Sequence, residues 1–376
     1  MALIYQIFDT TLSLLLLKVL AKNAMISYSI FCKVFIAALL LSVCTALTST
    51  IFSQAVEGKS MNLMFYNVEN LFDTIDDPLT QDEEFTPGSE KNWDIDKYEK
   101  KLKDISRIIE SVSTEELPGI IGFAELENEK VLLDLRDQKR LKQEKYEVLL
   151  IDGNDPRGID CGMLYRPDMF ELKSREMLPV KDLSDDNYPL RGILHIIGKG
   201  PDNKDLHIYI NHWKSRYGGV KETEEYRIFS AIALRRELDR LLESDSNSRI
   251  IIMGDFNDEP TNHSIYQILQ AGNKRKNIRL NDTYNLFYDI HNLDIAGSYC
   301  YNGVWQMYDQ IILSYNLLNQ DSDLSTSYDA GKIYKADWML FHDKKNNVNI
   351  PNRTYGGNNY FGGVSDHFPV YVSFSW

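Results

Sequence analysis

The sequence is poor in cysteine and has no block of basic residues. Of its four cysteines, only Cys161 and Cys300 lie beyond the N-terminal 57 residues. These two allow at most one internal disulfide, which argues against a disulfide scaffold, and neither belongs to a C-x-x-C pair of the kind that binds zinc. The net charge of −14 argues against tight, metal-free clamping of nucleic acid by lysine and arginine. A phosphodiester substrate remains open, because divalent cations would screen an acidic site.

Residues 58–376 also lack a repeat period and a low-complexity linker. The whole chain has 376 residues, of which 43% are hydrophobic, and this is ample for a large core. We therefore expect residues 58–376 to form one domain.

An apolar segment near the N-terminus is typical of protein targeting. After Met25, which is an alternative start, come the apolar run Val34–Leu47 and small residues at Ser53–Ala55 that suit cleavage. The pattern predicts that residues 1–57 are a targeting or signal segment and that the protein is secreted or lies in the periplasm or cell envelope. The alternatives are an uncleaved anchor and lipidation at Cys44, both of which would associate the chain with a membrane.

The stretch Arg249–Pro260 places polar side chains directly after an apolar run. Ile250–Met253 shows no alternation, which is typical of a strand buried on both faces. Asp255 and Asn257 follow at once, where open α/β sheets build their sites. An Asx-rich turn, in which these side chains bond their own backbone, explains the same residues equally well.

Other predicted strands also end in polar side chains. Taken along the chain, these residues are Asn67 with Glu69, Glu125, His212, Asp255 with Asn257, Asp309, and Asp366 with His367. Each has a structural alternative, such as a turn cap for Asn67 or a helix N-terminus for Glu125. Their occurrence at most strand ends indicates one shared site.

The apolar periodicity predicts helices at residues 95–112, 129–141 and 222–242. Several strands read as hairpins, including residues 192–197 with 206–210, and a further strand is predicted at residues 331–340. We therefore expect an α+β or α/β fold, a layered sandwich of two mostly antiparallel or mixed sheets flanked by helices.

The chain resembles the endonuclease/exonuclease/phosphatase superfamily, which shares the fold of pancreatic deoxyribonuclease. Seven motifs occur in the family's order: F-Y-N-V-E-N-L-F-D (65–73), G-F-A-E-L-E-N (122–128), R-G-I-D-C-G-M-L-Y (157–165), N-H-W-K-S-R (211–216), M-G-D-F-N-D-E-P (253–260), Y-D-Q-I-I-L-S (308–314) and G-G-V-S-D-H-F-P-V (362–370). The first and fourth are most similar to the bacterial branch of predicted extracellular nucleases. The resemblance covers essentially all of residues 61–376.

The resemblance implies a role for each strand-end residue. It places a divalent cation, Mg²⁺ or else Mn²⁺ or Ca²⁺, at Glu125, with Asn67 and Asp366 close by. His367 resembles the family's catalytic histidine and Asp309 the acid that orients it. Positioning of the attacking water is implied for Asp255 and Asn257, and His212 resembles a second histidine that contacts phosphate or acts as general acid. The pair of histidines is predicted without assigning acid and base.

Further residues are weaker candidates for substrate binding. Arg157 and Asp160 flank a predicted strand and either contact phosphate or pair with each other, and Arg216 follows His212. The loop His342–Gly363 has glycine hinges and aromatic residues on which a base or sugar could stack, although these rings could equally pack the loop.

The sequence thus predicts a secreted or envelope-associated, divalent-metal-dependent phosphodiesterase, most simply a nuclease of low sequence specificity acting on DNA or RNA. A phosphatase or a lipid phosphodiesterase of sphingomyelinase or inositol-phosphate type is the alternative, since the same motifs recognise the phosphate and not its substituents. A non-catalytic binding protein on the same fold ranks lower, because no catalytic position is missing. No protein partner is indicated.

Overall fold

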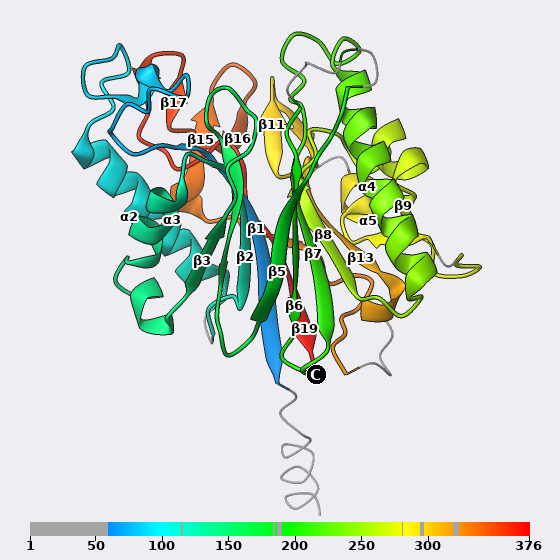
Figure 1. Ribbon diagram of the computed structural model, residues 1–376. Coiled ribbons are helices and arrows are strands. Elements are labelled where there is room, and N and C mark those ends of the chain that lie inside the picture. Colours follow the sequence, from blue (N-terminus) through cyan, green and yellow to red (C-terminus); the bar gives the residue numbers. More distant parts are fainter. Residues whose placement is uncertain are drawn as a thin grey trace, which may run out of the picture. The chain divides into compact units, whose positions relative to one another are not determined.

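Two β-sheets lie face to face at the centre of the protein, with helices on their outer faces (Figure 1). The computed structural model describes residues 59–113, 116–182, 185, 190–279, 281–293, 297–318 and 323–376. Lys59–Trp376 form one compact unit, and the predicted targeting segment lies outside the described residues. Within the described ranges no helix is both long and apolar enough to cross a membrane. The predicted sandwich of mixed sheets is confirmed.

The first sheet has six strands in the order β14-β19-β1-β2-β4-β3. Only β1 and β2 run parallel, and the other neighbours are antiparallel. The strands are β1 (Ser60–Leu71), β2 (Ile120–Leu126), β3 (Glu147–Leu150), β4 (Asp160–Tyr165), β14 (Lys332–Ile333) and β19 (Val370–Ser375).

The second sheet has seven strands in the order β5-β6-β7-β8-β13-β10-β9. Its central pair, β7 and β8, is parallel, and the predicted hairpin is β6 with β7. The strands are β5 (Glu171–Leu178), β6 (Ile193–Lys199), β7 (Asp205–His212), β8 (Ile250–Asp255), β9 (Ala271–Gly272), β10 (Thr283–Asn285) and β13 (Asp309–Ser314).

Burial on both faces explains why the central strands are continuously apolar. In β8, Ile251 and Met253 pack into the core between the sheets, whereas Ile250 and Ile252 pack under the outer helix. Successive side chains of a strand point to opposite faces, so a strand covered on both faces needs apolar residues at every position. The run is therefore a consequence of the position of β8 between the facing sheet and the outer helix α4 (Glu224–Ser244).

Helices cover the outer face of each sheet. On the first sheet lie α2 (Ile95–Val112) and α3 (Glu129–Arg136), and on the second α4 (Glu224–Ser244). Asp94 caps α2 by accepting a hydrogen bond from the Lys97 backbone N–H. The apolar stripe of α2 faces the sheet. The short helices are α5 (Tyr288–His291), the 3₁₀ turns Glu83–Phe85, Leu141–Glu144, Tyr315–Leu317 and Asp337–Met339, and the π turn His263–Ile268.

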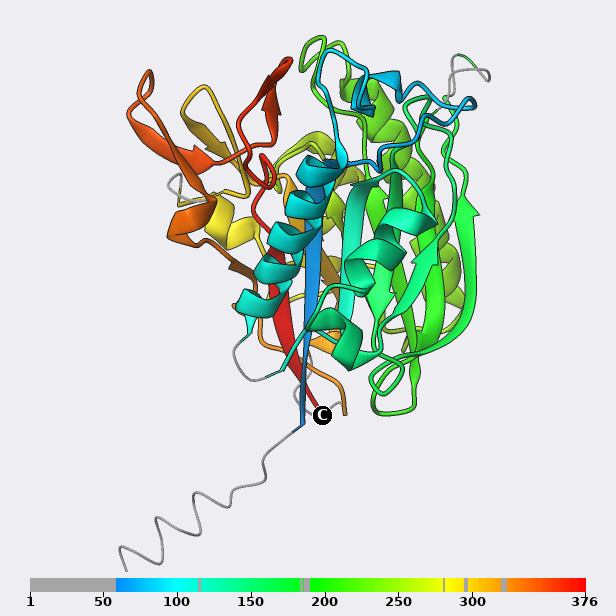
Figure 2. The ribbon, with the colours of Figure 1, turned by 90° about the vertical axis from the view of Figure 1, so that its left-hand side faces the viewer.

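Three small hairpins stand at one end of the sandwich, where Figure 2 shows them projecting beside the sheets. They are β11 (Tyr299–Tyr301) with β12 (Val304–Gln306), β15 (Leu340–Asp343) with β16 (Val348–Pro351), and β17 (Tyr355–Gly356) with β18 (Asn359–Tyr360). The last two lie within the loop His342–Gly363 and the segment before it. This end also carries the polar strand ends.

One prediction about an edge strand is wrong, and another edge strand was not predicted. The strand predicted at residues 331–340 is only Lys332–Ile333, because β14 pairs with β19 at two positions before the chain turns into the Asp337–Met339 helix. Conversely, β5 is a full strand that the sequence pattern does not reveal. Its side chains are mostly exposed, so it carries charged residues at positions where a central strand would be apolar.

Candidate active site

The strand registers bring the predicted residues to one edge of the sandwich. In the second sheet His212 is paired with Asp255, and Asp255 with Asp309. In the first sheet Asn67 is paired with Ala124, so Glu125 follows it directly on the parallel strand. Parallel strands present their C-terminal ends at the same edge, and the antiparallel strand β13 begins at this edge with Asp309.

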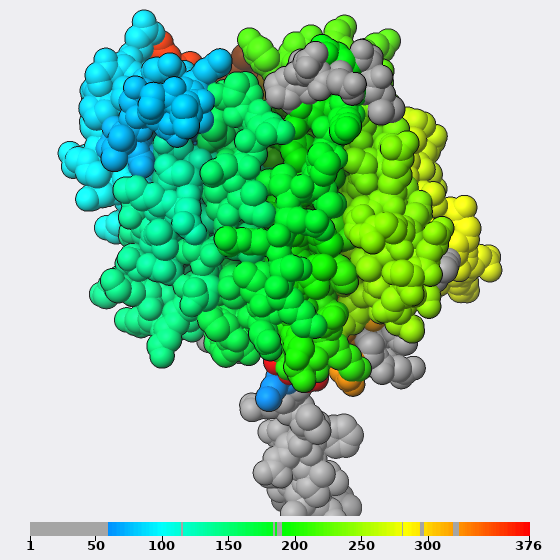
Figure 3. Space-filling model, viewed as in Figure 1, coloured from blue at the N-terminus to red at the C-terminus, as the bar shows by residue number. Residues whose placement is uncertain are grey.

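A pocket of about 630 Å³ opens at this edge. In Figure 3 the blue segment after β1 and the green segment before α4 rise on either side of the upper edge. Of the predicted site residues, those that line the pocket are Glu125, Arg157, His212, Arg216, Asp255, Asn257, Asp366 and His367. Asn67 and Asp309 are buried behind this lining.

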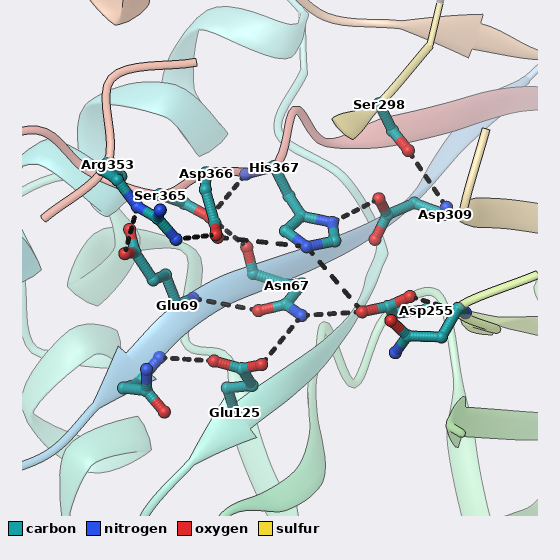
Figure 4. A network of polar contacts seen from close by, with 12 residues as sticks. Asn67, Glu69, Glu125, Asp255, Ser298, Asp309, Arg353, Ser365, Asp366 and His367 are labelled. Carbon is teal, nitrogen blue, oxygen red and sulfur yellow. Dashed lines mark hydrogen bonds and ion pairs between the residues drawn. The ribbon is translucent and has the colours of Figure 1, made fainter. Parts of the chain in front are cut away.

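His367 and Asp309 form a buried hydrogen-bonded pair (Figure 4). His367 Nδ1 lies 2.6 Å from Asp309 Oδ2, and the Ser298 hydroxyl accepts a hydrogen bond from the Asp309 backbone N–H. Ser365 Oγ accepts from the His367 N–H and donates to the Asn67 carbonyl, which ties the histidine to β1. A carboxylate on Nδ1 fixes the imidazole orientation and leaves Nε2 facing the pocket.

Carboxylates decide the charge of His367. Burial alone would lower its pKa, but Asp309, Asp255 and Asp366 raise the pKa well above its ordinary value. These carboxylates therefore favour the form of the imidazole that is protonated on both nitrogens. A charged imidazole is suited to stabilising an anionic phosphoryl group.

Asp255 lies between the two histidines. Its Oδ2 is 3.8 Å from His367 Nε2, 3.8 Å from His212 Nε2, and accepts a 3.0 Å hydrogen bond from Asn67 Nδ2. Its Oδ1 accepts from the Asn257 backbone N–H, so the predicted Asx turn is present within the site. Burial raises the pKa of Asp255 to about 7, although His367 opposes the shift.

His212 has the opposite electrostatic environment. Burial, followed by the charges of Arg191 and Arg157, lowers its pKa well below the ordinary value. Its Nε2 lies 3.6 Å from Glu125 Oε1, and its Nδ1 is buried without a hydrogen-bond partner. The site therefore contains one neutral and one charged imidazole.

The backbone is strained where carboxylates enter the pocket. Glu69, Asn70, Glu125 and Asn257 all have positive φ, at 51°, 56°, 67° and 49°. Left-handed backbone is costly for a glutamate, and such strain is concentrated at functional sites. At Glu125 it lets Oε2 accept from the Asn70 backbone N–H at 2.9 Å while Oε1 faces His212.

The pocket carboxylates fit a hard divalent cation. Glu125, Glu69 and Asp366 all line it, and burial together with the charge of Asp366 raises the pKa of Glu69 to about 8. This crowding of acids is the environment that a cation relieves, and carboxylate oxygens are the ligands that Mg²⁺ and Mn²⁺ prefer. Glu125 and Asp366 are the residues that would hold it.

The amide of Asn67 is held by hydrogen bonds at both ends, and its role as a metal ligand stays a prediction. Its Oδ1 accepts from the Glu69 backbone N–H at 3.0 Å, and this fixes the amide so that Nδ2 faces the acids. Nδ2 donates to Asp255 and to Glu125. Asn67 is therefore placed to orient two carboxylates.

A second group of potential ligands is Asp255, Asp309 and His367, whose ligand atoms lie within 4.8 Å of one another. No other such group of three occurs among the described residues. Here the 2.6 Å bond to Asp309 already occupies His367 Nδ1, and Asp309 is fully buried. We therefore interpret this group as a proton-handling cluster.

Of the three weaker candidates for substrate binding, two line the pocket and one does not. Arg157 and Arg216 line the pocket, whereas Asp160 does not: its Oδ1 accepts from the Gly153 backbone N–H at 2.8 Å. The alternative of an Arg157–Asp160 pair is also wrong, because Arg157 pairs with Asp155. Asp160 holds the turn that precedes its strand.

Lys101 is a residue that the sequence analysis missed. It is buried on α2 and donates to the Glu69 carbonyl, Thr354 Oγ1 and the Val364 carbonyl at 2.6, 2.6 and 3.1 Å. Burial lowers its pKa to about 8. Its burial could have been predicted from its position on the apolar stripe of the helix, three residues after Tyr98.

Replacing Lys101 with methionine is expected to lower the free energy of unfolding by about 2–3 kcal/mol, because three buried acceptors lose their donor. Denaturant unfolding measures this loss. Lys103→Met, at an exposed position of the same helix, is the matched control and should change stability little. Equal stability of the two variants would show that Lys101 is not the tie between these segments.

The model of the endonuclease/exonuclease/phosphatase family matches residues 62–375. A comparison with curated proteins finds no match.

Several solved structures are similar in fold. An endonuclease/exonuclease/phosphatase family protein from Bacteroides thetaiotaomicron has 14% identity and a TM-score of 0.53, with 85% of this chain and 99% of that chain covered. The mannosyl-6-phosphatase of Bacteroides thetaiotaomicron VPI-5482 has 14% identity and a TM-score of 0.52, covering 84% and 100%. TDP2 of D. rerio, complexed with a single-strand DNA product, has 14% identity and a TM-score of 0.50, covering 85% and 100%. At this identity the similarity shows a shared fold.

Proposed function

Because the chain belongs to the endonuclease/exonuclease/phosphatase family, whose members are phosphoric-ester hydrolases, we propose that it is a divalent-metal-dependent phosphodiesterase that hydrolyses nucleic acid. The observation that carries the proposal is the pocket itself, where acids, two histidines, arginines and exposed tyrosines face one volume. The motif residues supply the chemistry of ester hydrolysis. The rim of the pocket, by which we mean Tyr217, Tyr301, Arg157, Arg191 and Arg216, supplies the preference for nucleic acid.

The hydrolytic roles follow from the protonation states. Asp255, with a pKa of about 7, is placed to orient the attacking water and accept its proton at Oδ2. His367 keeps its proton on Nε2 and stabilises charge on the phosphoryl oxygens, while Asp309 holds the ring in place. A divalent cation bound by Glu125 and Asp366 supplies charge neutralisation at the phosphate.

The rim supports a polynucleotide substrate. Tyr217 is 91% exposed and Tyr301 is 60% exposed, and both line the pocket. Exposed aromatic rings are stacking platforms for unpaired bases. Arg157, Arg191 and Arg216 add guanidinium groups suited to phosphate oxygens.

Replacing Tyr217 or Tyr301 with alanine is expected to raise KM for a single-stranded oligonucleotide about tenfold, since stacking on one aromatic ring contributes about 1–3 kcal/mol per base. KM for a small phosphomonoester such as p-nitrophenyl phosphate should stay unchanged. Tyr266→Ala, an exposed tyrosine outside the pocket, is the control. Equal effects on both substrates would contradict the nucleic-acid assignment.

A phosphatase is the second candidate, and the size of the pocket favours it. A volume of about 630 Å³ is typical of sites for small molecules. Turnover of sugar phosphates or inositol phosphates, without cleavage of DNA or RNA, would establish this alternative. Hydrolysis of sphingomyelin vesicles would identify a lipid phosphodiesterase.

We also propose that the protein is secreted or lies in the periplasm or envelope, on the basis of the apolar segment Val34–Leu47. N-terminal sequencing of protein from fractionated cells tests this, with a start after Ala55 expected. An intact N-terminus in the cytosolic fraction would contradict it.

A further inference from the structure

Four arginines line the pocket, and one of them differs from the others in the acids with which it forms ion pairs. Arg157 and Arg191 pair with Asp155, and Arg216 pairs with Asp258; neither acid lines the pocket. Arg353 instead pairs with two acids that do line it. Its Nη2 donates to Asp366 Oδ2 at 2.5 Å, and its Nε donates to Glu69 Oε1 at 3.4 Å (Figure 4).

We propose that Arg353 is a displaceable counter-ion of the cation site and, once displaced, a phosphate-binding residue. In the protein without metal its guanidinium pairs with Asp366 and contacts Glu69. When a divalent cation binds at Asp366, Arg353 gives up that carboxylate and turns its donors toward the substrate phosphate. The inference rests on the proposed metal-dependent function. It adds an order of binding, in which the cation binds first and the substrate phosphate second.

Competition for Asp366 is the first reason. One of its oxygens accepts from Arg353, and the other lies 3.9 Å from His367 Nε2. The Arg353 guanidinium therefore already occupies one oxygen of this carboxylate. A divalent cation at the same side chain is disfavoured while the guanidinium stays, because like charges repel strongly at such distances.

The fixed backbone is the second reason. The Thr354 N–H donates to Glu69 Oε2 at 2.7 Å, and the Gly363 N–H donates to the Arg353 carbonyl at 3.2 Å. A Cβ on Gly363 would collide with the Asn352 carbonyl oxygen, so these strands of the loop are in close contact. Displacement thus moves the guanidinium and not the loop, and the side chain is 44% exposed, which leaves it room to turn.

The chemistry of guanidinium is the third reason. Its planar fork matches the geometry of both carboxylate and phosphate oxygens, so a released Arg353 can exchange one anion for another. Because it lines the same pocket as Asp255 and His367, the phosphate that it binds lies at the proposed reaction centre.

Binding of Mn²⁺ to the full chain without substrate, measured by calorimetry, tests the first step. Arg353→Gln is expected to lower the Kd for Mn²⁺ about tenfold, since a charge-assisted bond that competes with the ion is removed. Arg157→Gln is the matched control: its side chain is 46% exposed and lines the same pocket, but it contacts neither Glu69 nor Asp366. It should lower the Kd by clearly less than Arg353→Gln does, because its charge acts on Glu125 at a distance and pairs with Asp155.

Three outcomes would overturn the inference. An equal gain in Mn²⁺ affinity in Arg353→Gln and Arg157→Gln would show only a general effect of the charge in the pocket. Weaker Mn²⁺ binding by Arg353→Gln would make Arg353 a support of the cation site. Failure of the wild-type protein to bind Mn²⁺ would reject the metal-dependent function as well, and so is distinct from the other two.

Inorganic phosphate tests the second step. Wild-type protein should bind phosphate at least about fivefold more tightly with Mn²⁺ than without it, and Arg353→Gln should lose most of this gain. Arg353→Lys, which keeps the charge, guards against misfolding and should give an intermediate Mn²⁺ affinity. Phosphate binding that is unaffected by Mn²⁺ in the wild type, or by loss of Arg353, would refute the order proposed.

Discussion

Replacing His367 with alanine is expected to lower kcat about 10³-fold, in line with the about 10²–10³-fold cost of removing one donor that stabilises developing charge. The ring is held at Nδ1 by Asp309 at 2.6 Å and carries the charge that faces the phosphoryl group at Nε2. Alanine removes that charge and leaves the Asp309 carboxylate buried without its partner. Initial rates at saturating Mn²⁺ measure the loss.

The control for this prediction is His342→Ala. His342 is exposed on the β15–β16 hairpin, where it contacts Asn349, and it does not line the pocket. It should retain the wild-type kcat. The kcat of Asp309→Asn should lie between those of His367→Ala and His342→Ala, because the imidazole of His367 stays but loses the carboxylate that favours its charged form. A His367→Ala enzyme with more than about a tenth of wild-type kcat would remove His367 from the mechanism.

Glu125→Gln is expected to reduce kcat/KM at least about 100-fold at a fixed, low Mn²⁺ concentration, because the carboxylate that would bind the cation becomes neutral. The amide keeps the shape and can still accept from the Asn70 backbone N–H. Raising the Mn²⁺ concentration should recover part of the activity. A titration of rate against Mn²⁺ therefore distinguishes weakened metal binding from misfolding.

Glu127→Gln is the matched control, since it makes the same change two residues later. Glu127 is buried and accepts from the Asp73 backbone N–H at 2.5 Å, and it does not line the pocket. Its activity should stay within about threefold of wild type. Equal losses in the two variants would indicate that the whole turn after β2, and not the Glu125 carboxylate, is required.

The central strands and their polar ends could be predicted because local sequence determines them. Ile250–Met253 is apolar at every position since both faces of β8 are covered, and the chain must become polar where that cover ends at Asp255. The pairing of Asp255 with His212 and Asp309 then follows from the strand register. The family motifs added the identity of the site.

The remainder depends on contacts that no local pattern encodes. Arg353 reaches Glu69 across 284 residues, and Lys101 reaches Thr354 across 253. In the sequence Arg353 is one of several polar residues in an aromatic loop, and Lys101 is a charge on an apolar helix face. The direction of the Asn67 amide could not be predicted, because it depends on a hydrogen bond from the backbone N–H of Glu69. Edge strand β5 was missed because solvent exposure removes the apolar signal.

The most direct test of a metal-dependent hydrolytic site is cleavage of a labelled single-stranded oligonucleotide by the purified chain with Mn²⁺, with chelator, and with the His367→Ala and Glu125→Gln variants. We predict cleavage that requires Mn²⁺, stops in chelator, and is lost or strongly reduced in both variants. Cleavage that persists in chelator, or at the wild-type rate in His367→Ala, would place the activity outside this pocket and contradict the account.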